Sequence, residues 1–273
     1  MKLMGIVNVT PDSFSDGGEF LDAEAAIAHG RELAAAGADV LDVGGESTRP
    51  GAEAVGAEDE LGRVGPVVEA LAGSEGPGVP VSIDTSKRAV AEAALDGGAA
   101  IVNDVTALRA DPELAGLCAD RGCGVVLMHM LGDPRTMQED PRYDDVVDDI
   151  KAFLTERIEF ATAEGIDEGR IWVDPGIGFG KTVEHNLELH RRLGELRELG
   201  RPIVFGSSRK SFIGKLTGAP VDERLGGTIA SNVMAYANGA DVLRVHDVGP
   251  IREAITVAEA ILDPDRAASI TDR

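Results

Sequence analysis

The sequence predicts an α/β fold, a single (β/α)8 barrel of parallel strands. Eight short apolar runs each end in a polar residue or a glycine turn, and a helix-like segment follows each run. Strict alternation of strands and helices is typical of a parallel sheet with right-handed crossovers. The chain has 273 residues, a common length for one such barrel. No glycine-rich dinucleotide motif follows the first run, which favours a closed barrel over an open, doubly wound sheet.

The eight expected strands are runs rich in β-branched residues and bounded by turns. We place them near residues 4–9, 39–43, 79–84, 99–104, 124–129, 170–174, 202–206 and 241–246. They end, in chain order, at Asn8, at residues 42–45, and at Asp84, Asn103, His129, Asp174, residues 207–210 and residues 244–246. Because the carboxyl ends of all strands meet at one face of such a barrel, we expect these residues to surround a single site.

The intervening helices are predicted from alanine and leucine at helical spacing. We place them near residues 23–36, 57–73, 87–96, 111–121, 144–164, 184–198, 222–238 and 249–262. Residues 1–262 form one predicted barrel, and residues 263–273 form a polar C-terminal tail. Three strand-to-helix loops are longer than usual, at residues 10–20, 45–57 and 130–143. Since long loops at this face often close over a substrate, we expect them to border the site.

The composition limits the kind of partner. Lys and Arg number 26 against 48 Asp and Glu, for a formal net charge of -22, which argues against nucleic acid as a partner. A local cationic pocket can still hold an anionic substrate. The acidity fits either ordinary solubility or a salt-rich cytoplasm, and the sequence leaves both open.

Nothing in the sequence predicts export or a membrane span. The first residues become polar too early for a signal peptide, and no apolar run approaches the roughly 20 residues of a membrane helix. The spacing of Cys118 and Cys123 is typical of neither a metal site nor a redox motif, so we expect small buried thiols in a reducing compartment. The chain is predicted to be soluble and cytoplasmic.

Four strand-end residues suit a nitrogen heterocycle. The carboxylates of Asp84 and Asp174 can accept from ring N–H and amino groups, and the amide of Asn103 can both donate and accept. Lys210 would add a donor to a ring nitrogen or carbonyl. Each residue alone is as easily a turn cap, because Asp and Asn favour turns. Four convergent positions favour a binding site.

A second group of strand-end residues suits a phosphate or pyrophosphate. Arg49, Arg244 and His246 follow the second and eighth expected strands, which only the first strand separates. Arginine makes bidentate contacts with phosphate, and Asn8 at the end of the first strand could help to place Mg²⁺. Arg49 alone could equally form a surface ion pair. Arg244 and His246 are two residues apart and should point to the same side of their strand.

Three long motifs stand out in the sequence, MGIVNVTPDSFSDGG at residues 4–18, DVGGESTRPG at 42–51 and DPGIGFGK at 174–181. Shorter motifs lie at residues 82–85, 103–105, 128–130, 206–210 and 244–248. Through these motifs the sequence closely resembles the dihydropteroate synthase family of folate biosynthesis. The resemblance covers about residues 1–262 and implies a TIM barrel. It also implies a transferase that condenses 6-hydroxymethyl-7,8-dihydropterin pyrophosphate with p-aminobenzoate.

The resemblance implies a role for each matching residue. The pterin positions are Asp84, Asn103, Met128, Asp174 and Lys210. The pyrophosphate positions are Asn8, Arg49, Arg244 and His246, with Mg²⁺ held at Asn8. The p-aminobenzoate positions are Thr48, Pro50, Phe179, Lys210 and Ser211. The catalytic residues are Asp84, Asp174 and Lys210, and the loops carrying Asp12, Asp16 and residues 47–50 close over the substrates.

The resemblance also implies a homodimer through outer helices of the later repeats, with small-molecule substrates as the other partners. Residues 46–57 lack the insertion of drug-insensitive relatives, so we expect sensitivity to sulfonamides. Three rival functions remain as alternatives. A metal-dependent hydrolase barrel would need an H-x-H motif on the first strand, which is absent. A pterin-dependent methyltransferase has no use for the pyrophosphate group, and a non-catalytic pterin-binding barrel would not need Arg49 and Lys210.

Overall fold

The structure is a computed structural model that describes residues 1–10, 19–48, 51–52, 54–133 and 135–263. Its strands are β1 (Lys2–Asn8), β2 (Val40–Gly44), β3 (Val81–Asp84), β4 (Ile101–Asp104), β5 (Gly124–Met128), β6 (Ile171–Asp174), β7 (Val204–Phe205) and β8 (Val242–Val245). They form one parallel sheet in the order β6-β5-β4-β3-β2-β1-β8-β7. An isolated parallel bridge between Val173 and Ile203 joins the two ends of the sheet. The predicted closed (β/α)8 barrel is confirmed.

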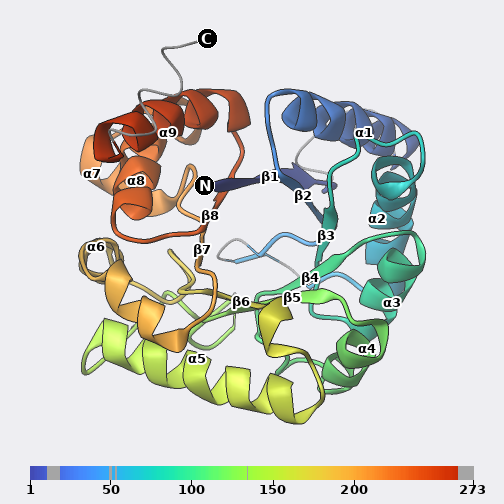
Figure 1. The fold of residues 1–273 in the computed structure, drawn as a ribbon, viewed down its shortest axis with the longest axis horizontal. Helices are drawn as coiled ribbons and strands as arrows, with labels where there is room; N and C mark the ends of the chain where they lie inside the picture. Colours follow the sequence, from blue (N-terminus) through green and yellow to red (C-terminus); the bar gives the residue numbers. More distant parts are fainter. Residues whose placement is uncertain (11–18, 49–50, 53, 134, 264–273) are drawn as a thin grey trace.

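An outer ring of helices surrounds the strands (Figure 1). The α-helices are α1 (Glu19–Ala35), α2 (Ala57–Ala72), α3 (Arg88–Asp96), α4 (Glu113–Arg121), α5 (Val146–Ala163), α6 (Val183–Arg191), α7 (Ser211–Thr217), α8 (Leu225–Ala237) and α9 (Val248–Leu262). Short 3-10 helices occur at η1 (Glu168–Arg170), η2 (Leu193–Leu199) and η3 (Val221–Glu223). No helix in the described part of the chain is long and apolar enough to cross a membrane.

The structure differs from the prediction in three places. The helix expected over residues 184–198 is α6 followed by η2, with Gly194 inside the second piece, where glycine weakens an α-helix. The strand expected over residues 202–206 shrinks to β7, because Pro202 has no N–H to give to the ladder. Helix α7 was not predicted, since its seven residues are too few to show helical periodicity.

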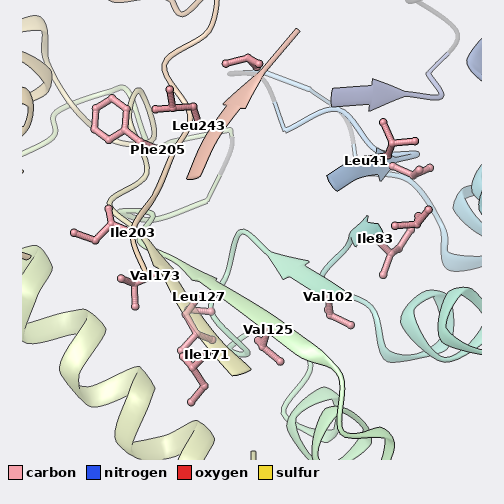
Figure 2. Packing of buried hydrophobic residues seen from close by; sticks show 14 of the residues in the cluster. Leu41, Ile83, Val102, Val125, Leu127, Ile171, Val173, Ile203, Phe205 and Leu243 are labelled. Atoms are coloured by element: carbon pink, nitrogen blue, oxygen red, sulfur yellow. The ribbon is translucent and has the colours of Figure 1, made fainter. Parts of the chain in front are cut away.

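Alternate residues of each strand face opposite sides of the sheet. One set packs outward against the helices, including Leu41, Ile83, Val102, Val125, Leu127, Ile171, Val173, Ile203, Phe205 and Leu243 (Figure 2). A second, smaller cluster forms an apolar plug made of Met4, Val40, Ile101, Val126, Val204 and Val242. Because the strands are parallel, the residues two positions beyond this plug lie one layer closer to the carboxyl ends. That layer is where the site begins.

Candidate active site

The first layer above the apolar plug is polar. Asp42, Asn103 and Arg244 each follow a plug residue by two positions, so their side chains share its face of the strand. Asn103 donates its Nδ2 to Asp42 Oδ2 at 3.0 Å, and Arg244 Nε donates to the same oxygen at 2.6 Å. Strands β2, β4 and β8 therefore meet through one fully buried carboxylate, that of Asp42.

Arg244 also connects this layer with the strand end above it. Its Nη2 donates to Asp84 Oδ2 at 2.6 Å. Arg244 thus lies between two carboxylates, one of which is the predicted pterin residue Asp84. The sequence assigned Arg244 to the pyrophosphate and Asp84 to the pterin, whereas in the structure these two side chains are in direct contact.

Burial and charge change the protonation behaviour of this group. Burial, together with the neighbouring carboxylates of Asp42 and Glu60, raises the pKa of Asp84 to about 7, although Arg244 opposes the shift. Burial disfavours the charged guanidinium of Arg244, but the carboxylates of Asp42 and Asp84 outweigh that effect and raise its pKa. One cation between two buried carboxylates leaves a net negative charge, which suits a ligand that offers N–H donors.

Asp174 ends β6 on the other side of the barrel mouth. It is buried, and its Oδ1 accepts a hydrogen bond from Gly176 N at 2.7 Å. Burial raises the pKa of Asp174, while the Gly176 N–H and the charge of Lys210 act in the opposite direction. Gly176 has φ +69°, and a Cβ there would lie 1.9 Å from the carbonyl oxygen of His129. Only glycine fits this turn, which fixes the rotation of the Asp174 carboxylate.

Lys210 and Phe179 face each other at the mouth. The Nζ of Lys210 lies 4.0 Å from the centre of the Phe179 ring, a cation–π contact. A Cβ on Gly178 would approach Lys210 Cδ to 3.3 Å, so the glycine-rich loop after β6 packs closely on this lysine. Lys210 directly precedes α7, whose first residue, Ser211, is exposed.

Met128 ends β5 and packs beside Phe179. Both are buried, in a small apolar cluster with Met130, Met137 and the partly buried Val105. This cluster forms an apolar wall next to the carboxylates. A flat ring with polar edges requires such a combination of surfaces, because its faces need apolar contact while its edges need hydrogen-bond partners.

Lys181 fixes the loop that carries Phe179. It is 3% exposed, and its Nζ donates to the Phe179 carbonyl oxygen at 2.9 Å and lies 3.0 Å from His129 Nδ1. Burial lowers the pKa of Lys181 well below its usual value. Burial and the nearby cations lower the pKa of His129 to about 2, so this imidazole is neutral. His129 also packs edge-on against Phe153.

Three of the predicted pyrophosphate residues, Asn8, Arg244 and His246, lie at the neighbouring ends of β1 and β8. Asn8 is half-buried and pairs in register with Gly44 of β2. His246 directly follows β8, and its Nδ1 lies 3.0 Å from Ser208 Oγ. Burial and the charge of Arg244 lower the pKa of His246 to about 3. Neutral His246 can therefore offer a ring N–H to a phosphate without carrying a charge.

Several predicted residues lie outside the described ranges. Arg49 and Pro50 are among them, as are Asp12, Asp16 and residues 264–273 of the predicted tail. Thr48 is described and is half-buried, shortly after β2.

Sequence reasoning gave no role to Asp42 or Lys181. Asp42 was named only as a strand ending, although its spacing of two from Val40 placed it on the inner face. Lys181 ends the motif at residues 174–181, and nothing in the sequence indicates that its side chain folds back to Phe179.

The chain was compared with known proteins. The family model described as pterin binding enzyme matches residues 4–246. The dihydropteroate synthase of Escherichia coli K12 is 46% identical over 260 residues, which cover 95% of this chain and 91% of that protein. The chain belongs to the dihydropteroate synthase family. It is therefore a transferase, and the resemblance seen in the motifs is confirmed.

Solved members of the dihydropteroate synthase family share the fold closely. The enzyme of Xanthomonas albilineans with 4-aminobenzoic acid is 50% identical, with a TM-score of 0.89, over 96% of this chain and 93% of that one. The enzyme of Yersinia pestis in a complex with a sulfonamide drug is 45% identical, with a TM-score of 0.90, over 95% and 94%. A probable bifunctional folylpolyglutamate synthase/dihydropteroate synthase of Haloferax volcanii is 46% identical over 99% of this chain, which spans 32% of that longer protein.

Proposed function

We propose that this chain joins 6-hydroxymethyl-7,8-dihydropterin pyrophosphate to p-aminobenzoate, giving 7,8-dihydropteroate and pyrophosphate. One observation carries the proposal. Four strands bring Asp84, Asn103, Asp174 and Arg244 to one end of a barrel whose lower interior is apolar, and Lys210 stands beside them. Family membership supports the same reaction.

The pterin edge would be recognised by oxygen acceptors. Asn103 gives its Nδ2 to Asp42, which leaves Oδ1 as the part of the amide that can accept from a ring N–H or amino group. Asp84 and Asp174 supply further acceptors, and the buried Met128 supplies apolar contact with the ring. Lys210 supplies a donor for a ring nitrogen or carbonyl. The layer beneath, through Asp42, fixes the orientation of Asn103.

The leaving pyrophosphate would be held by donors at the ends of β1 and β8. The two carboxylates use two of the five N–H donors of the Arg244 guanidinium, so Arg244 can hold them and a phosphate oxygen at once. His246 adds a neutral ring donor, and Arg49 follows β2 in the sequence. Donors positioned on the leaving group lower the barrier to breaking its bond to the methylene carbon.

The residues that are present fit Mg²⁺, although no group of three or more His, Cys, Asp and Glu side chains in the described ranges could hold a metal ion by itself. Mg²⁺ usually keeps several waters and binds through one or two protein oxygens together with substrate phosphates. Asn8 is half-buried between the ends of β2 and β8, and its amide oxygen is a hard donor of the required kind. When bound, Mg²⁺ would neutralise charge on the departing pyrophosphate.

The bond changes then follow from the charges. The C–O bond breaks with its electron pair leaving on pyrophosphate, and the methylene carbon conjugated to the pterin becomes electron-poor. The carboxylates of Asp84 and Asp174 stabilise this positive charge. The neutral arylamine of p-aminobenzoate attacks the carbon, forms the C–N bond and loses a proton. Phe179 and Lys210 face the side from which it would approach, with Thr48, Pro50 and Ser211 as its further predicted contacts.

The direct test mixes the protein with both substrates and Mg²⁺ and follows 7,8-dihydropteroate by liquid chromatography and mass spectrometry. We expect product in proportion to enzyme and none when either substrate is omitted. Because the net charge of -22 fits a salt-rich cytoplasm, the assay is repeated over a range of KCl concentrations. Failure to form product at every salt concentration would refute the function.

The raised pKa of Asp84 predicts an acidic limb in the pH profile. Asp84 must be ionised to accept two donors from the pterin edge, and its pKa is about 7. Carboxyl groups are charged above their pKa, so kcat/KM for the pterin pyrophosphate should fall as pH drops below about 7. The Asp84→Asn variant should have lower activity and should lack this limb. An unchanged limb in that variant would assign the titration to another group.

We expect sulfonamides to compete with p-aminobenzoate, as the predicted residues at Thr48, Phe179 and Lys210 are all present. Steady-state rates measured against both compounds should show a KM for p-aminobenzoate that rises with sulfonamide while kcat stays constant. Unaltered turnover at saturating sulfonamide and subsaturating p-aminobenzoate would contradict this expectation.

We also propose a homodimer and a cytoplasmic location. Helices α6, α7 and α8 enclose an apolar hollow of about 340 Å³. Leu216 and Met234 are more than half exposed beside it. The Met234→Asp variant should shift the mass measured by light scattering toward the 28.5 kDa of one chain, while an unshifted mass would place the interface elsewhere.

Cys118 and Cys123 are buried free thiols, which agrees with a reducing compartment.

A further inference from the structure

A three-residue ionic cluster lies close to the strand end that carries Asp84, and none of its members is among the residues predicted to bind substrate. Lys87 Nζ donates to Glu46 Oε2 and to Glu60 Oε2, both at 2.5 Å. Glu46 follows β2, Glu60 lies in the first turn of α2, and Lys87 directly precedes α3. We call these three residues the Lys87 cluster. It joins two consecutive strand–helix units through one cation.

The Lys87 cluster is largely removed from solvent. The Glu60 side chain is 0% exposed, and those of Lys87 and Glu46 are 25% and 22% exposed. A buried carboxylate is strongly destabilising unless a partner compensates it. Burial disfavours the charge on Lys87, but its hydrogen bonds to the two glutamates outweigh burial and raise its pKa. Lys87 therefore stays charged and forms an ion pair with each of the two carboxylates.

Glu46 extends the cluster into the loop between β2 and α2. Its second oxygen, Oε1, accepts a hydrogen bond from the Val55 backbone N–H at 3.0 Å. One side chain thus ties residue 46 to residue 55, and Thr48 lies between them in the sequence. Next to it, Arg63 Nη1 of α2 donates to the Gly45 carbonyl oxygen at 2.9 Å. The start of this loop is therefore held by two hydrogen bonds, one at Glu46 and one at Gly45.

The other end of the cluster reaches the strand that carries Asp84. Lys87 is three residues beyond Asp84, and its backbone N–H donates to Thr85 Oγ1 at 3.2 Å. The charge of Glu60 also acts on Asp84. The cluster consequently sets the position of the start of the loop relative to the strand end that would bind the pterin.

We propose that Lys87, Glu46 and Glu60 are positioning residues. They hold residues 46 and 55, and with them the intervening Thr48, in a fixed position relative to Asp84 and thereby control the binding of p-aminobenzoate. This inference rests on the proposed function. None of the three residues belongs to the groups proposed to touch substrate. The competing interpretation is that the cluster only stabilises the fold, and the two interpretations differ in which kinetic constant changes.

Glu46→Ala is the decisive variant. It removes the hydrogen bonds of Glu46 to Val55 and to Lys87 and leaves the buried Lys87–Glu60 pair intact. We expect a melting temperature close to that of the parent and an unchanged Kd for 6-hydroxymethylpterin. The KM for p-aminobenzoate should rise about tenfold or more, since small misplacements of a binding loop are costly. The Val55 amide should exchange its hydrogen faster, because its acceptor has been removed.

Lys87→Met tests the cation itself. It should raise the KM for p-aminobenzoate similarly and should also lower the melting temperature, because Glu60 is left buried without a partner. Lys87→Arg should restore most of both properties, as a guanidinium can bond to two carboxylates. Lys151→Met is the matched control. Lys151 is 28% exposed and also pairs with two acids, Asp148 and Glu198, but it lies on the outer helix α5.

The outcomes separate the two proposals. A parent enzyme without turnover overturns the proposed function and this inference with it. A parent with turnover, whose Glu46→Ala variant keeps the parental KM for p-aminobenzoate, overturns the inference alone. A variant that loses pterin affinity to the same extent as p-aminobenzoate affinity also overturns it, because the whole mouth would then have changed. A selective rise in KM together with faster Val55 exchange supports it.

Discussion

The Lys210→Ala variant should lose about a thousandfold or more in kcat/KM, the size of effect seen when a positioned charge is removed from a reacting centre. The ammonium of Lys210 contacts the ring of Phe179, and its charge acts on the carboxylate of Asp174. It is the one residue proposed to contact both substrates. Its side chain is only half-buried, so truncation should leave the fold intact.

Steady-state kinetics with each substrate varied in turn would measure this effect, with circular dichroism and a melting curve to verify folding. Lys215→Ala is the matched control, because Lys215 is exposed on α7, the short helix that Lys210 directly precedes. It should retain parental kinetics. Similar losses in both variants would mean that α7, rather than the Lys210 ammonium, is responsible.

The strand pattern of the fold was predictable because it is local. Each strand shows a short apolar run closed by a turn, and period-two alternation alone separates the plug from the outward-facing core. The elements that were missed lack such a signal. Helix α7 is too short to show one. The change from α6 to η2 has Gly194 as its one local mark, and the ion pair formed there, between Arg192 and Asp145, joins residues 47 apart in the chain.

The sequence predicts which residues gather at the candidate site, but it does not predict which of their side chains are in contact. Parallel strands bring all carboxyl ends to one face, so Asp84, Asn103 and Asp174 could be grouped from their spacing. Which side chain meets which depends on register and tilt around the closed barrel. Asp42 bonds to Asn103 and Arg244, which are 61 and 202 residues away in the chain. No sequence spacing reveals such a contact.

The same limit applies to the division of tasks among the strands. From the sequence, Arg244 belonged to the pyrophosphate group and Asp84 to the pterin group. The structure joins them through a 2.6 Å hydrogen bond. In the proposed reaction, binding of the pterin edge and departure of the pyrophosphate would therefore be coupled through one guanidinium, because a change in charge at either group alters the field at the other.

That coupling makes Arg244→Met the second large prediction. The variant should lose about a thousandfold in kcat/KM, because it removes a donor from the leaving group and the partner of Asp84. It should also lose stability, by about 3–5 kcal/mol, the usual effect of breaking a buried ion pair by removing one partner. The Arg244 side chain is 21% exposed and its two carboxylate partners are 0% and 12% exposed.

The stability loss should depend on pH in a defined direction. Burial already places the pKa of Asp84 at about 7, far above its ordinary value of 3.8, and without Arg244 it should rise further. A carboxyl group whose pKa is raised by folding lowers the free energy of unfolding. It does so only at pH values at which the group is ionised in the unfolded chain. The penalty is therefore absent below the unfolded pKa and complete above the folded one. The melting-temperature difference between parent and variant should be larger at pH 8 than at pH 5.

The double variant Arg244→Met with Asp84→Asn separates stability from activity. It removes the ionisable group at position 84, so the pH-dependent part of the lost melting temperature should return, whereas turnover should stay as low as in the single variant. The part of the loss that comes from Asp42, which is fully buried and also loses its bond to Arg244, should remain. Melting curves at both pH values and one kinetic assay are sufficient. A loss in Arg244→Met that is the same at pH 5 and pH 8, or a pH dependence that persists after Asp84→Asn, would show that the loss does not come from ionisation of Asp84.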